Sequence, residues 1–150
     1  MSSALMRALN RVPAFMAPAE EDWWIFGSAA AALHGVVIGP VRDIDILVSE
    51  ADAVRMMERH ALVNLADGGT MRFSSDIILR PGFGDMPVEV LSGFSVKGSP
   101  VCWTPVQPAI RVDIGLDTGS VFVPSRAELA QIARLCGRPR DLQRAEVLER

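Results

Sequence analysis

Three carboxylates stand at positions in the sequence where their spacing could support chemistry. Asp43 and Asp45 are separated by one residue within the stretch 42–48, which is otherwise apolar after Arg42. In an extended strand alternate side chains point to the same face, so this stretch predicts two aspartates on one face and isoleucines on the other. Two like charges this close repel each other, and a bound cation would relieve the repulsion.

Glu89 is the third carboxylate and lies between two valines. A charge in such a segment costs free energy unless it is paired or ligated. If this strand lies beside 42–48, three carboxylates converge, and such oxygen ligands suit Mg²⁺ and phosphoryl or nucleotidyl transfer. The alternative is an ion pair between Asp43 and Arg42 or a later arginine, a loop cap at Asp45, and a solvent-facing Glu89.

A Gly-Ser turn precedes the aspartates. The sequence predicts a strand over 23–26, then a helix over about 28–33 with Ser28 as its N-cap. Backbone N–H groups and a hydroxyl at a helix start bind anions, and Gly27 allows a phosphate to approach the backbone closely. Asp43 follows Ser28 by fifteen residues. The two motifs together are more selective than either alone.

The remaining pattern predicts one α/β (α+β) domain over residues 1–150, with a small mixed, twisted β-sheet flanked by helices. We expect the active cleft at the ends of strands 42–48 and 86–92, and we expect strands 70–80 and 86–92 to form a hairpin. The other expected elements are an N-terminal helix over 3–17 interrupted by Pro13 and followed by a connector to residue 22, a helix over 50–61, a loop over 92–108, strands over 110–114 and 120–123, and C-terminal helices within 124–150.

Several single residues carry smaller expectations. Val54 and Met57 are expected on the buried side of the helix over 50–61, and Trp24 is expected in the core. His34 is more often a packing or capping residue than a base at such a helix end. Arg138 and Arg140, two residues apart, either contact phosphate or form a solvated helix terminus with Asp141 as partner.

The composition excludes some classes of protein. The 150 residues carry a net charge of −3, which disfavours a general nucleic-acid coating protein. The two cysteines, Cys102 and Cys136, lie far apart and predict reduced thiols. No apolar run is long enough to span a membrane, and no secretory signal is recognisable. We therefore expect a cytoplasmic protein.

The order of these motifs resembles the nucleotidyltransferase superfamily with a DNA polymerase β-like palm. The resemblance rests on Gly27-Ser28, a helix, Asp43-Ile44-Asp45 and the later single acid Glu89, and covers most of the chain from Trp24 onward. The segment Leu33-His34-Gly35 and the tail over 128–142 are similar to those of minimal single-domain bacterial members and of toxins related to AbiEii.

The resemblance implies a catalytic site. Asp43, Asp45 and Glu89 would be the catalytic residues and would hold Mg²⁺, with two ions expected. Gly27 and Ser28 would bind the β- and γ-phosphates of an NTP, with Arg42 as a further nucleotide-binding residue. An acceptor hydroxyl on RNA, protein or a small molecule would attack the α-phosphate and release pyrophosphate. A toxin–antitoxin setting would add an antitoxin as a protein partner.

The sequence departs from the family pattern at three positions. Val41 stands where Thr or Ser is common, Glu89 replaces an aspartate, and Ala133 aligns with a lysine, with Arg134 beside it. These departures motivate an alternative, a non-catalytic nucleotide- or partner-binding member of the same fold. A metal-dependent glycosyltransferase is disfavoured, because the chain is short for that fold and the Gly-Ser turn would be unexplained.

Overall fold

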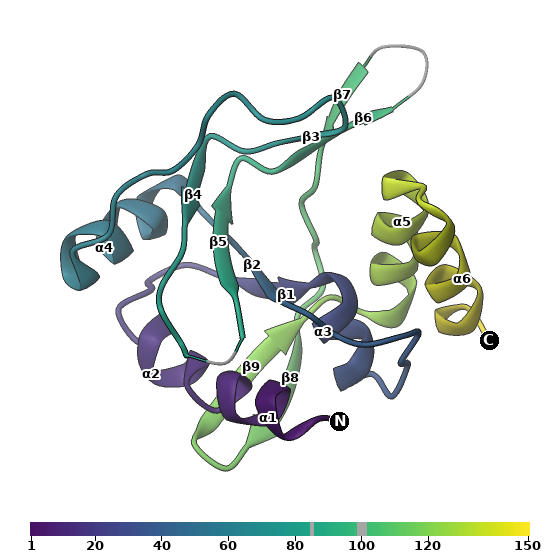
Figure 1. Cartoon of the computed structure of the whole chain (residues 1–150), viewed down its shortest axis with the longest axis horizontal. Coiled ribbons are helices and arrows are strands. Elements are labelled where there is room, and N and C mark those ends of the chain that lie inside the picture. The colour runs from purple at the N-terminus through teal and green to yellow at the C-terminus, as the bar shows by residue number, and fades with distance from the viewer. Residues whose placement is uncertain (85, 99–101) are drawn as a thin grey trace.

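A four-stranded mixed sheet lies at the centre of the chain (Figure 1). The structure is a computed structural model, and it describes residues 1–84, 86–98 and 102–150. The strand order is β1-β2-β5-β4; the central pair β2–β5 is parallel and both outer pairs are antiparallel. The predicted mixed sheet and the hairpin leading into the 86–92 strand are therefore confirmed. The strands are β1 (Trp24–Phe26), β2 (Ile44–Val48), β4 (Ile77–Leu79) and β5 (Val88–Ser92).

Two smaller β-structures adjoin this sheet. The first has the order β3-β6-β7, formed by β3 (Phe73–Ser74), β6 (Ser95–Gly98) and β7 (Cys102–Pro105). The second is a hairpin of β8 (Val112–Leu116) and β9 (Gly119–Val123).

Two sequence expectations were wrong here. The 70–80 segment is split between two sheets, because β3 pairs with β6 whereas β4 pairs with β5. The expected loop over 92–108 contains β6 and β7, with residues 99–101 outside the described part of the chain. Its many Gly, Ser and Pro residues resemble a loop, but Phe94 and Val96 are buried and fix the strands against the core.

The helices surround the central sheet. In Figure 1, α4 lies at the left and packs on β4 and β5, whereas α5 and α6 pack against each other at the right. Helix α5 also contacts α3 and β6. Within the described residues, no helix is both long and apolar enough to cross a membrane. The helices are α1 (Ser3–Leu9), α2 (Val12–Met16), α3 (Gly27–Leu33), α4 (Glu50–His60), α5 (Arg126–Cys136) and α6 (Pro139–Leu148).

The N-terminal segment forms two helices instead of one interrupted helix. Helix α1 ends at Leu9, and Pro13 lies in the first turn of α2, where its missing N–H leaves no intrahelical hydrogen bond unmade. The tryptophan expectation was also wrong. Trp23 is buried edge-on against Phe122, whereas the indole of half-buried Trp24 donates a hydrogen bond to the carbonyl of Ile110.

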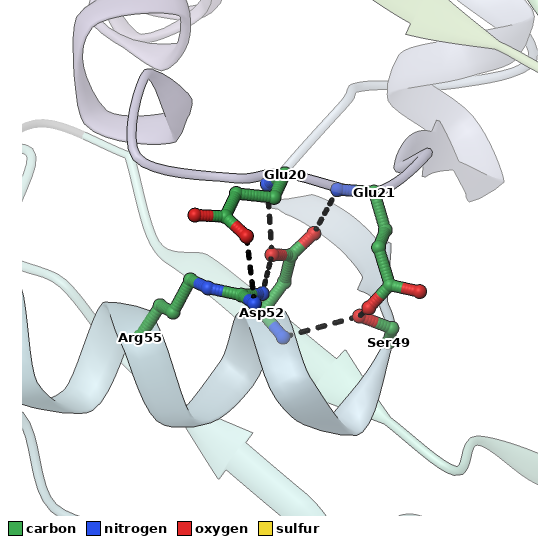
Figure 2. Close-up of polar contacts among 5 residues, drawn as sticks. All are labelled: Glu20, Glu21, Ser49, Asp52 and Arg55. Carbon is green, nitrogen blue, oxygen red and sulfur yellow. Dashed lines mark hydrogen bonds and ion pairs between the residues drawn. The ribbon is translucent and has the colours of Figure 1, made fainter.

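Helix α4 buries a carboxylate (Figure 2). The Asp52 side chain is fully buried and accepts hydrogen bonds from the backbone N–H groups of Glu20 and Glu21, both at 2.9 Å. Arg55 forms an ion pair with it at 2.7 Å and also contacts Glu20. The fully buried residues of α4 are Asp52, Ala53 and Met56. The prediction was wrong for Val54, which is exposed, whereas Met57 is partly buried and packs against the core as predicted. A polar contact fixes the connector to the helix.

Candidate active site

The pairing of β2 with β5 brings two of the predicted carboxylates together. In this parallel pair Asp45 lies directly opposite Glu89, so both side chains leave the same face of the sheet. Asp43 comes one residue before β2 begins at Ile44, so it lies inside the predicted strand but just outside the observed one. Burial alternates as expected, with Ile44 and Ile46 in the core and Asp45 half-buried between them.

The Gly-Ser turn meets the same carboxylates. Phe26 of β1 pairs with Asp45, and α3 starts at the next residue without an intervening loop. Gly27 has a φ of +69°, and a Cβ at this position would lie 3.7 Å from Oδ2 of Asp45. Glycine therefore gives the backbone a conformation that other residues rarely adopt, within reach of the carboxylate.

Ser28 does not have its predicted capping role. The N-cap position of α3 is Phe26, and no side chain caps this helix. Ser28 instead lies within the first turn of α3 and lines the same cavity as the carboxylates.

All six predicted site residues line one cavity of about 750 Å³. The cavity lies between the part of the sheet that carries Asp45 and Glu89 and the helices α5 and α6. These helices contribute Ala133, Cys136, Arg140 and Arg144 to its lining. The predicted residues that it brings together are Gly27, Ser28, Arg42, Asp43, Asp45 and Glu89.

The aspartates have unusual electrostatics. Burial, followed by the charges of Asp43 and Glu89, raises the pKa of Asp45 to about 8. Burial and the charge of Glu89 also raise the pKa of Asp43, while Arg138 and Arg144 act in the opposite direction. Within the described residues, no side chain forms a hydrogen bond or ion pair with either aspartate. A cation bound between them would favour their charged forms.

The donor set suits Mg²⁺ in its chemistry, because it consists of carboxylate oxygens. Asp43 and Asp45 could hold such an ion, but Glu89 is engaged with Arg80, whose Nε lies 2.7 Å from its Oε2. As the side chains lie, no three His, Cys, Asp or Glu residues in the described part of the chain are gathered closely enough to hold a metal ion. A three-carboxylate site therefore requires Glu89 to leave Arg80.

Two arginines of the cavity, Arg80 and Arg144, were missed by the sequence reasoning, whereas Arg42, Arg138 and Arg140 were named as candidate phosphate contacts. Arg138, Arg140 and Arg144 line it from α6 and the residue before α6, and Arg80 lines it from the end of β4. The sequence signal for Arg138 and Arg140 was that two arginines stand beside Asp141 at the start of the last helix. Asp141 was expected to pair with Arg138 and Arg140. In the structure it pairs with Arg138 and Arg144.

Other candidate residues have structural roles. Ala133 faces the cavity as aligned, whereas Arg134 pairs with Glu149. His34 lies outside the cavity lining, and its Nε2 is 2.8 Å from the carbonyl oxygen of Pro124. Both cysteines are free thiols, Cys102 exposed and Cys136 buried at the cavity. Burial and the charge of Asp141 raise the pKa of Cys136 to about 11.

The fold of this chain resembles that of solved structures, although its sequence matches no known family. No protein-family profile matches the chain, and no curated protein is significantly similar in sequence. Among solved structures, a candidate nucleotidyltransferase from Thermotoga maritima superposes with a TM-score of 0.70 at 20% identity, covering 96% of this chain and 89% of that one. An antigenic nucleotidyltransferase-like protein from Paracoccidioides brasiliensis gives a TM-score of 0.58 at 16% identity, covering 99% of this chain and 77% of that one. The chain therefore has the fold of the nucleotidyltransferase superfamily.

Proposed function

We propose that this protein is a Mg²⁺-dependent nucleotidyltransferase, which moves a nucleoside monophosphate from an NTP to an acceptor hydroxyl. The observation that carries the proposal is the alignment of Asp45 with Glu89 across β2 and β5, next to Gly27 and Asp43, in one cavity. The fold of the chain supports the general class.

Each residue has a definite task in this proposal. Asp43 and Asp45 would hold Mg²⁺, and Glu89, once free of Arg80, would supply a third carboxylate. Gly27, Ser28 and Arg42 bind the phosphates of the NTP. When bound, Mg²⁺ supplies positive charge where the α-phosphate and the leaving pyrophosphate develop negative charge. The acceptor oxygen forms the new bond to the α-phosphorus, the bond to pyrophosphate breaks, and the hydroxyl proton passes to a carboxylate or to water.

A second candidate is a nucleotide-binding protein without turnover. The ion pair of Glu89 with Arg80 and the uncharged Ala133 in the cavity favour it. Both candidates require NTP binding, so binding is measured first and turnover second.

The test is calorimetric titration with ATP, GTP, CTP and UTP, with and without Mg²⁺. We expect Mg²⁺-dependent binding by the wild type and its loss in Asp43→Asn/Asp45→Asn. Asp113→Asn is the matched control, because Asp113 is exposed on β8 and does not line the cavity. A folded wild type that binds no NTP would overturn both candidates. If binding is found, incubation with labelled NTP and RNA, protein or small-molecule acceptors distinguishes the enzyme from the binder.

A further inference from the structure

At the start of α6 one buried carboxylate holds two guanidinium groups. Oδ2 of Asp141 lies 2.6 Å from Nε of Arg138, and Oδ1 lies 3.2 Å from both Nη2 of Arg138 and Nη1 of Arg144. The backbone N–H of Arg138 also donates to Oδ2 at 3.2 Å. The Asp141 side chain is only 4% exposed, so the two arginines are fixed by a shielded partner.

The orientation of Arg138 is fixed from a second direction. Its guanidinium carbon lies 5.2 Å from the centre of the Phe73 ring, so the planar group rests on an aromatic face. Arg144 is 7% exposed in its side chain, yet it lines the cavity together with Arg138. An arginine is rarely buried to this degree unless it has a specific partner or task.

The charges at this end of α6 are not balanced. One carboxylate is shared by two arginines, and Arg140, which also lines the cavity, has no ion-pair or hydrogen-bond partner in the part of the chain that the structure describes. This end of the cavity is therefore positively charged. The opposite side of the cavity carries the carboxyl groups of Asp43, Asp45 and Glu89.

We propose that Arg138 and Arg144, held by Asp141, form a polyphosphate site that binds the triphosphate tail of the nucleotide. This inference rests on the proposed function and adds a second set of phosphate contacts, on α6, to those at Gly27 and Ser28. Guanidinium groups match phosphate oxygens in geometry and remain charged at every relevant pH. Helix α5 cannot supply this charge, because Ala133 faces the cavity and Arg134 is engaged with Glu149.

The simplest competing explanation is that these arginines only offset the charge of the nearby aspartates. The two explanations differ in what the arginines bind. A polyphosphate site predicts that inorganic tripolyphosphate binds without a base or sugar, and that both arginines contribute to its affinity. Charge balance alone predicts no such binding.

The experiment measures the affinity of the whole chain for tripolyphosphate, ATP and adenosine by calorimetry in the presence of Mg²⁺. We expect Arg138→Gln and Arg144→Gln each to weaken tripolyphosphate and ATP by about ten-fold, as is typical for the loss of a charge-assisted hydrogen bond. Arg138→Lys should retain part of the affinity because it keeps the charge. Arg134→Gln on α5 is the matched control and should leave the affinity unchanged. Far-ultraviolet circular dichroism and thermal melting check that each variant is folded; Arg138, which is half-exposed, is the safer of the two positions.

The outcomes separate this inference from the proposed function. Mg²⁺-dependent ATP binding that needs Asp43 and Asp45 but is unchanged in Arg138→Gln and Arg144→Gln would overturn the polyphosphate site and retain the function. A wild type that binds tripolyphosphate through these arginines but binds no NTP would retain the site and overturn the function. Equal losses of adenosine and ATP would also overturn the site, because adenosine carries no phosphate.

Discussion

Asp45 is a carboxyl group that the folded chain keeps partly protonated near neutral pH. Burial and two neighbouring carboxylates raise its pKa from 3.8 to about 8. Between these two values the unfolded chain gives up the proton while the folded chain keeps it. The free energy of unfolding of the metal-free protein should therefore fall as the pH rises through this window.

This expectation has a direct measurement. Urea denaturation of metal-free protein between pH 5 and about 8 should show decreasing stability, and Asp45→Asn should flatten the profile, because the amide resembles the neutral acid. At about pH 7.5 the variant should be more stable than the wild type by at least about 1 kcal/mol. Identical pH profiles for both proteins would show that Asp45 titrates normally.

At the scale of residues, the sequence predicted six residues that the structure places in one cavity, for a physical reason. Alternation along a strand and the conformational freedom of glycine are local properties, so Asp43, Asp45 and Gly27 could be recognised without tertiary information. The partner of Glu89 could not. Arg80 faces it because β4 runs antiparallel to β5, and this pairing is a property of the whole sheet.

At the scale of elements, Asp52 carries more than the local stability of α4. Its two oxygens accept hydrogen bonds from the backbone N–H groups of Glu20 and Glu21, so the helix and the connector before β1 are joined through one side chain (Figure 2). Asp52→Ala should lower the free energy of unfolding by about 2–3 kcal/mol, because it removes these hydrogen bonds and the ion pair of Asp52 with Arg55.

The matched control is Glu50→Ala, in the same first turn of α4 but exposed. It should cost less than about 0.5 kcal/mol, the range of ordinary surface substitutions. Urea denaturation of both variants checks the difference. Equal losses in the two would mean that Asp52 acts only through the helix dipole.

The sequence reasoning failed at elements whose pattern is set by remote contacts. The buried face of α4 was predicted to consist of apolar residues only. Asp52 is also buried there, because the connector supplies its hydrogen-bond donors from more than thirty residues away. Strands β6 and β7 were assigned to a loop, because Gly, Ser and Pro dominate the segment and the pairing with β3 has no local signal. Helices α5 and α6, with their clear periodicity, were placed well.

At the scale of the whole molecule, the cavity is assembled from distant parts of the chain, from Phe26 at one end to Arg144 at the other. A ligand in it therefore contacts both the sheet and the C-terminal helices, and should stabilise the folded state as one unit. At a concentration about 100 times its Kd, Mg-ATP should add about 2.7 kcal/mol to the free energy of unfolding.

Thermal melting with and without Mg-ATP checks this coupling. Tryptophan fluorescence, which reports on Trp23, Trp24 and Trp103 in or beside the β-structure, and circular dichroism, to which α5 and α6 contribute, should give the same raised midpoint. Adenosine in the presence of Mg²⁺ should raise the melting midpoint less, because it lacks the phosphates. Midpoints that separate on ligand addition would mean that only part of the chain senses the ligand.

The two thiols of the chain differ in a way that matters at the bench. Thiol-directed reagents react with the thiolate, and at neutral pH the thiol of buried Cys136 stays almost entirely protonated because its pKa is about 11. Cys102 is exposed on β7 and does not line the cavity. The natural sequence therefore offers a single position for a fluorescent or paramagnetic label, and ligand binding can be followed by spectroscopy without removing either cysteine.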